Sequence, residues 1–161
     1  MNRRFVLALL VALPTAVALG QEPDPNGPQP ELPKEKLVIV TQDGVSHPFK
    51  VEMATTQEQQ TVGEMFRTSV PADGGMLFDW GISRPANMWM RNTLVPLDMV
   101  FINANGTIRA IAENTTPRSL AIISSHGPVR AVLELQAGIT AKLNIRVGDV
   151  IHQRIFGNAQ Q

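Results

Sequence analysis

The alternation of apolar and polar residues along the chain predicts many short strands and few helices. A β-branched run at residues 37–40 ends at the turn signal Asp43-Gly44. Phe49, Val51 and Met53 then alternate with polar residues, which is typical of a half-buried strand. Asn105-Gly106 lies between two apolar runs and gives the clearest hairpin signal in the chain. We expect further strands at residues 76–78, 87–92, 97–103, 107–113, 129–135 and 147–156.

Helical signals are confined to two places. Thr55 followed by Glu58 fits a capping box and predicts a helix that continues to about Phe66. A second short helix fits residues 138–143. Many short strands with one or two short helices predict a mainly β fold, either a compact β-sandwich or a barrel-like domain.

The N-terminus has the pattern of a secretory signal peptide over residues 1–20. Arg3 and Arg4 precede an apolar run, and small residues follow, so cleavage is expected after Gly20 or after Ala18. The apolar stretch is shorter than the roughly 20 residues that cross a bilayer. We therefore expect a periplasmic or secreted protein with no stable membrane span after cleavage.

The chain after the leader divides into a tether and one domain. Residues 21–35 are rich in proline, and a stretch of this kind is typical of an extended linker. Residues 36–157 are expected to form a single β-rich domain. This length is enough for one hydrophobic core.

Composition excludes several classes of function. The 14 basic and 14 acidic residues give a formal net charge of zero, which argues against electrostatic binding of nucleic acid. The chain has no cysteine, so a disulfide framework, a thiolate zinc site and a cysteine nucleophile are excluded. No phosphate loop or dinucleotide motif occurs, and no cofactor is expected.

The densest group of polar side chains lies near the middle of the chain. It consists of Trp89, Arg91, Asn92, Thr93 and Asp98, which together supply a guanidinium, an amide, a hydroxyl and a carboxylate beside an aromatic ring. One hypothesis is a binding site for a small ligand or an envelope protein, because the arginine can offer a planar fork to a carboxylate or phosphate. The alternative is structural, with these groups saturating the backbone of a tight connection.

Several ordered motifs resemble those of the family named domain of unknown function 192. The resemblance covers about two-thirds of the chain and implies a compact, mainly β domain, often behind a signal peptide, with no established activity. Two positions depart from the family pattern: Glu64 replaces the usual leucine, which favours a solvent-facing helix position, and Met88 replaces an aromatic. The motifs are Gly63–Arg67, Gly75–Phe78, Trp89–Thr93, Pro96–Ile102, Val132–Leu135, Gly138 and Gly148-Asp149.

Two other functions stay open as alternatives. Met88 and Met90 offer thioethers that suit copper, with His47, His126 and His152 as further ligands, although core filling explains the methionines equally well. The second alternative is a hydrolase that acts on envelope carbohydrate. It would use Ser124, Ser125 and His126 with Asp98, or an acid–base pair drawn from Asp79, Asp98, Glu134 and Asp149, although Glu134 alternates with leucines in a way that also fits a solvent-facing position.

Overall fold

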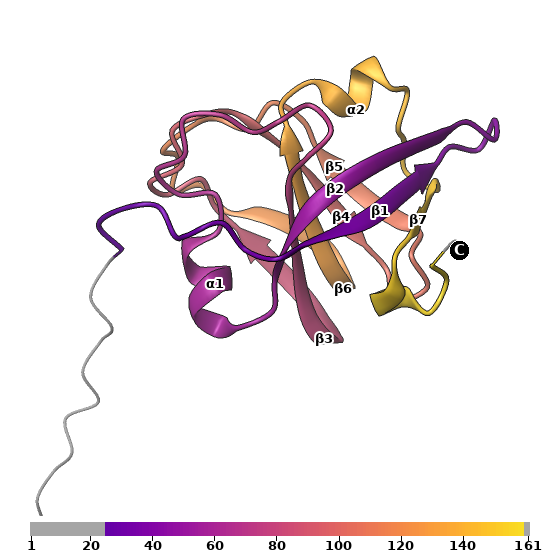
Figure 1. Ribbon diagram of the computed structural model, residues 1–161, viewed down its shortest axis with the longest axis horizontal. Helices are drawn as coiled ribbons and strands as arrows, with labels where there is room; N and C mark the ends of the chain where they lie inside the picture. The colour runs from indigo at the N-terminus through magenta and orange to yellow at the C-terminus, as the bar shows by residue number, and fades with distance from the viewer. Residues whose placement is uncertain (1–24, 160–161) are drawn as a thin grey trace, which may run out of the picture.

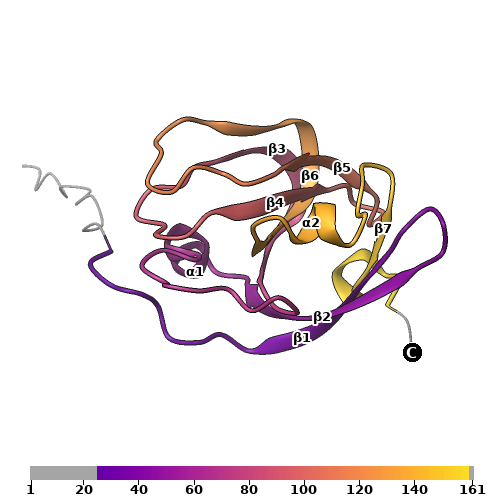
Figure 2. The same cartoon turned by 90° about the horizontal axis from the view of Figure 1, so that it is seen from above.

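The computed structural model describes residues 25–159, so the predicted leader lies outside the described residues. One sheet of seven strands curls into a nearly closed barrel with the strand order β5-β4-β6-β3-β2-β1-β7 (Figures 1 and 2). The predicted mainly β, barrel-like fold with two short helices is therefore confirmed. The elements are β1 (Lys34–Val40), β2 (Ser46–Ala54), α1 (Gln57–Val62), β3 (Met76–Met88), β4 (Leu97–Ile102), β5 (Ile108–Ala112), β6 (Ile123–Gln136), α2 (Ile139–Lys142), β7 (Val150–His152) and the 3-10 turn η1 (Arg154–Phe156).

The two edges of the sheet meet at the start of β5. Thr107 forms an antiparallel bridge with Val150. The N–H of Ile108 donates to the carbonyl of Asp149 at 2.8 Å, and the N–H of Ile151 donates to that of Gly106 at 2.8 Å. These bonds satisfy backbone groups that would otherwise be unpaired along open strand edges.

Local signals predicted most elements but misjudged several ends. The hairpin at Asn105-Gly106 is confirmed as the β4–β5 turn. The capping box is shifted by one residue, to Thr56 and Gln59, and α1 ends at Val62. The expected continuation to Phe66 was wrong. Strand β3 has 13 residues where a run of three was expected, and β6 has 14 where seven were expected. Their far ends pair with each other across bulges and are largely exposed.

Two hydrophobic clusters form the core, one on each face of the sheet. All seven strands contribute to the first, which fills the barrel, and connecting segments cover the second on the outer face of β3, β4 and β6. Alternation along β4 illustrates this arrangement: Val100 and Ile102 join the first cluster, whereas Met99 and Phe101 join the second. Every residue of β4 is consequently buried.

Residues 25–33, here called the strap, lie against the barrel before β1 begins (Figure 1). The amide of Gln29 donates to the carbonyls of Gln59 and Gly63 at 3.1 and 3.0 Å, and Met53 donates its N–H to the carbonyl of Pro33 at 3.0 Å. The described part of the predicted linker is therefore held by the domain. Within residues 25–159, no helix is long and apolar enough to cross a membrane.

Candidate functional site: a carboxylate pocket

Strand register brings two glutamates to the same face of the sheet. Glu52 on β2 pairs with Met76 on β3, and Met76 pairs with Glu134 on β6. Paired residues on neighbouring strands point to the same side, so the two glutamates flank the methionine in one row. Connecting segments cover this row, and both side chains are buried. The solvent-facing position suggested for Glu134 was wrong.

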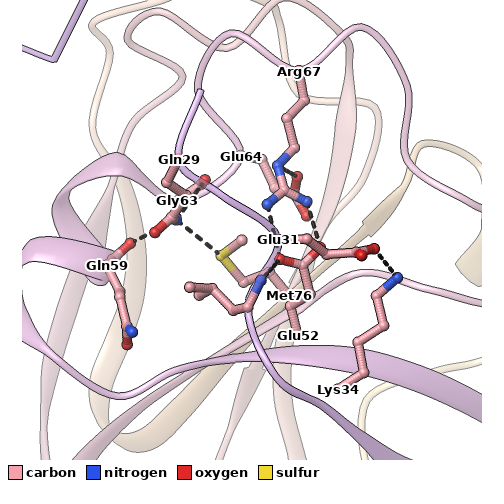
Figure 3. A network of polar contacts seen from close by, with 10 residues as sticks. Gln29, Glu31, Lys34, Glu52, Gln59, Gly63, Glu64, Arg67 and Met76 are labelled. Carbon is pink, nitrogen blue, oxygen red and sulfur yellow. Dashed lines mark hydrogen bonds and ion pairs between the residues drawn. The ribbon is translucent and has the colours of Figure 1, made fainter. Parts of the chain in front are cut away.

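The segment after α1 adds a third glutamate and an arginine. Gly63 caps the C-terminus of α1, and its φ of 50° and close approach to the Phe78 ring leave no room for a side chain. The chain then turns tightly, and the N–H of Arg67 donates to the carbonyl of Glu64. Glu64 lies beyond the end of the helix and beside Arg67 (Figure 3), and it is only 3% exposed. The solvent-facing helix position expected for this residue was wrong.

Arg67 connects the carboxylates (Figure 3). Its two terminal nitrogens donate to Oε1 and Oε2 of Glu52 at 2.5 and 2.8 Å, and the strap adds the N–H of Leu32 to Oε2 at 2.7 Å. Nε of Arg67 lies 3.3 Å from Oε2 of Glu64 without the geometry of a hydrogen bond. Among the described residues, this buried oxygen of Glu64 therefore has an ion-pair neighbour but accepts no hydrogen bond.

The three carboxylates differ in their proton affinity. Burial acts to raise the pKa of Glu52, but the hydrogen bonds from Arg67 and Leu32 outweigh it and keep that pKa below its ordinary value. Burial raises the pKa of Glu64 to about 7, despite the positive charge of Arg67. Burial also raises the pKa of Glu134 well above its ordinary value, and the nearby charge of Glu64 adds to this effect. The guanidinium of Arg67 thus lies near three buried carboxyl groups, and of these only Glu52 is firmly ionised.

A cavity of about 420 Å³ opens beside this cluster. Glu52, Glu64 and Arg67 line its inner part, whereas the exposed residues Lys50 and Asp73 lie at its mouth. Of the remaining charged lining residues, Lys34 forms an ion pair with Glu31. The backbone at Gly75 approaches the row so closely that a Cβ there would lie 2.2 Å from the carbonyl oxygen of Glu134. We refer to this cavity and the three glutamates as the carboxylate pocket.

The five residues proposed from the sequence as a binding site lie elsewhere. Trp89 is 43% exposed, and the guanidinium of Arg91 stacks over its ring at 5.4 Å. Asn92 adopts a positive φ of 54° and its carbonyl accepts the N–H of Phe66, while Thr93 is buried in the same turn. The turn is therefore tied to the segment after α1 by a backbone hydrogen bond, and it also presents an aromatic side chain to solvent.

Asp98, the fifth of these residues, is fully buried at the start of β4. Its Oδ1 accepts the N–H groups of Asn114 and Gly138 at 2.9 and 3.0 Å. Its Oδ2 accepts the N–H and hydroxyl of Thr140 at 3.0 and 2.7 Å. These bonds join β4 to the segment after β5 and to α2, so the contacts of this carboxylate favour a structural role.

Neither alternative chemistry gains support from the geometry. Met88 and Met90 pack into the second core cluster, where the sulfur of Met90 accepts the Thr115 hydroxyl at 3.1 Å. In the part of the chain that the structure describes, no group of three or more histidine, aspartate or glutamate residues could hold a metal ion. Ser124 Oγ accepts the backbone N–H of His126 at 3.2 Å, which is a turn contact.

Sequence reasoning missed the carboxylate pocket because its members are far apart in the chain. The strand alternation that places Val51 and Met53 in the core also predicts that Glu52 faces solvent, and this expectation ignores the outer covering of the barrel. A glutamate inside an otherwise apolar run, as at Glu134 and Glu52, was the available signal. The second signal was Glu64, which stands where the family usually has leucine.

Comparisons with known proteins agree with this architecture. A Sinorhizobium meliloti 1021 structure, described as a proposed transcription regulator, is 44% identical with a TM-score of 0.77, over 79% of this chain and 98% of its own. A Novosphingobium aromaticivorans DSM 12444 protein of unknown function is 34% identical with a TM-score of 0.73, over 76% and 86% of the two chains. No curated protein matches.

The family comparison covers most of the barrel. Residues 38–153 match the model of the family DUF192, described as "Uncharacterized ACR". This range runs from within β1 to the residue after β7, and it includes all three glutamates of the carboxylate pocket. The resemblance noted from the motifs is confirmed, and the chain belongs to the domain of unknown function 192 family.

Proposed function

We propose that this protein is an exported binding domain that takes up a small ammonium compound in the carboxylate pocket. The observation that carries the proposal is Oε2 of Glu64, a residue that lines the cavity: this oxygen is buried and accepts no hydrogen bond from the described residues. A buried acceptor without a hydrogen bond is costly, so a donor from a ligand would stabilise it. The leader-like residues 1–20 support export.

The charge balance of the pocket favours a cation over an anion. Arg67 is already committed to Glu52 through two hydrogen bonds. Ionised Glu64 therefore shares a single guanidinium with a second carboxylate, and Arg67 is also the one cation among the described residues that acts on the neighbouring Glu134. An ammonium group carries both the positive charge and the N–H donors that Glu64 lacks.

The mouth of the pocket limits the ligand further. A volume of about 420 Å³ is in the range of pockets for small molecules. Lys50 at the mouth would meet a negative group on the same ligand, so amino acids are included in the expected class. The neutral net charge of the chain gives no support to nucleic-acid binding, whatever the description of the Sinorhizobium relative.

A hydrolase that used this cluster would need an ionised carboxylate with a free oxygen. Glu52 is the ionised member, but both of its oxygens accept hydrogen bonds from Arg67, and one also accepts a backbone N–H. Its basicity is thereby reduced and its access to a substrate is blocked. The contacts therefore argue against Glu52 as the base of a hydrolase.

Thermal shift and calorimetry would test this proposal with matched ligands. The panel pairs ethanolamine with ethylene glycol, and L-alanine and putrescine with propionate and butanediol. We expect stabilisation by the amines alone. A ligand at 100 times its Kd adds about 2.7 kcal/mol of stability, which for a domain of this size raises Tm by about 10 °C.

The Glu64→Gln variant should lose amine binding, while Asp73→Asn at the mouth serves as the control that retains most of it. Protons and the ammonium group compete for Glu64, whose pKa is about 7. The Kd should therefore rise about tenfold for each pH unit below that pKa. Equal shifts by the amines and their uncharged partners, or full binding by Glu64→Gln, would refute the proposal.

A further inference from the structure

Two segments far apart in the sequence form one continuous surface beyond the ends of β3 and β6. Met88 pairs with Ile123, the last such pair of these two strands. Beyond it, the N–H of Met90 donates to the carbonyl of Ser119 at 3.0 Å, and the N–H of Arg118 donates to that of Thr93 at 3.1 Å. Figures 1 and 2 show the β3–β4 and β5–β6 connections at one end of the long axis, the end near which the described chain begins.

Large apolar side chains project from this surface into solvent. Trp89 is 43% exposed, Leu120 66% and Ile122 62%. The neighbouring pair, Met88 and Ile123, packs against the second core cluster. Because successive side chains of an extended strand point to opposite faces, Trp89 and Ile122 face outward. These three residues, here called the Trp89 surface, are half of the large exposed apolar side chains in the described chain.

The charged residues within the two segments that form this surface have one sign. Residues 88–95 and 116–123 contain Arg91 and Arg118 but no aspartate or glutamate. Arg91 stacks on the Trp89 ring, and Arg118 is exposed beside Leu120. An aromatic ring with aliphatic and cationic neighbours is the combination that suits the headgroup level of a bilayer, where apolar groups insert and guanidinium groups meet phosphates.

We propose that the Trp89 surface docks this domain peripherally onto a bilayer that contains anionic lipid. The proposal is independent of the carboxylate pocket and of its ligand. It depends on the apolar side chains of two hydrogen-bonded segments and on the absence of acidic residues from residues 88–95 and 116–123. Trp89, Leu120 and Ile122 enter the interface, and Arg118 contacts lipid phosphate.

Tryptophan fluorescence can test this contact directly, because the chain has only two tryptophans. The protein is recovered from cells that express the full sequence, in a Trp80→Phe variant that leaves Trp89 as the reporter. Vesicles contain phosphatidylcholine alone or with 30% phosphatidylglycerol, with and without brominated chains. We expect a blue shift and bromine quenching of Trp89 only with phosphatidylglycerol. Arg118→Gln should weaken partitioning about fivefold, as expected for one cation near an anionic surface.

Two controls keep the result specific to this surface. Trp89→Phe with Trp80 retained should remove the quenching, which also covers the case in which Trp80→Phe fails to fold. Val147→Ser, a change at an exposed apolar residue elsewhere, should leave partitioning unchanged, whereas Ile122→Ser should reduce it. Bromine quenching reports Trp89 itself, so attachment through an unprocessed leader does not imitate it. If bromine does not quench Trp89, or if Arg118→Gln and Ile122→Ser leave the quenching unchanged, the proposal is overturned and a protein partner is favoured.

Discussion

At the scale of single residues, the carboxylate pocket shows how neighbouring glutamates acquire different protonation states. Glu52 has three hydrogen-bond donors to its oxygens and stays ionised, whereas Glu64 has only a misaligned guanidinium, so burial decides its pKa. Burial is also the main cause of the raised pKa of Glu134. Proximity to Arg67 alone therefore does not determine the charge, because the geometry of each contact matters as much as its distance.

The raised pKa of Glu64 predicts a specific dependence of stability on pH. The folded protein binds this proton more tightly than the unfolded chain, so the free energy of unfolding falls as pH rises from about 4.5 to about 7. The loss is about 3 kcal/mol for this group alone. Glu64→Gln should remove this part of the pH dependence and be more stable than wild type at pH 8, as measured by urea unfolding across pH.

The matched control is Glu58→Gln, which changes an exposed glutamate on the nearby helix α1. Its stability should follow the wild-type curve. If Glu64→Gln shows the same slope between pH 5 and 7 as wild type, Glu64 is ionised in the folded state throughout this range. That result would contradict both the pKa and the competition between protons and ligand.

At the scale of elements, buried polar side chains position the short helices. Helix α2 has only four residues and no side-chain cap of its own. Asp98 on β4 supplies the missing acceptor by taking the N–H groups of Gly138 and Thr140. A helix this short is marginal by itself, so its position depends on this tertiary contact.

Asp98→Asn should therefore lower stability as its main effect. The amide replaces one accepting oxygen with an N–H₂ group that faces other donors, at an expected cost of about 3 kcal/mol. Asp73→Asn, at an exposed position, should cost little by comparison. Chemical denaturation measures the loss, and amide exchange should show faster opening at Gly138 and Thr140. A variant of wild-type stability that loses ligand binding would instead support a binding role for Asp98.

The elements also show which features sequence patterns can predict. The Asn105-Gly106 hairpin is local, so its turn residues were sufficient. The far half of β3 contains Gly81 and Pro85 and has little apolar alternation, so only pairing with β6 reveals it as a strand. Glu52 and Glu134 alternate as though they faced solvent, because a strand pattern does not report what covers the outer face of a barrel.

At the scale of the whole molecule, the barrel depends on the strap as well as on the sheet. The composition of this region predicts a solvated tether, because its four prolines leave few backbone donors. The Leu32 N–H nevertheless completes the bonding of Glu52, and Gln29 crosses to α1 and the turn after it (Figure 3). Contacts of this kind join residues 20 to 34 positions apart, which a local pattern does not encode.

Removing the strap should therefore weaken the domain and alter the pocket. A chain that begins at residue 34 loses the Leu32 N–H bond to an ionised carboxylate and both bonds from Gln29. We expect a loss of about 2 to 4 kcal/mol relative to a chain that begins at residue 25, measured by urea unfolding at pH 8. The difference should shrink as pH falls and Glu52 takes up a proton, because a neutral carboxyl depends less on that donor. Equal stability of the two chains at pH 8 would show that the strap is a passive tether, as its composition alone suggests.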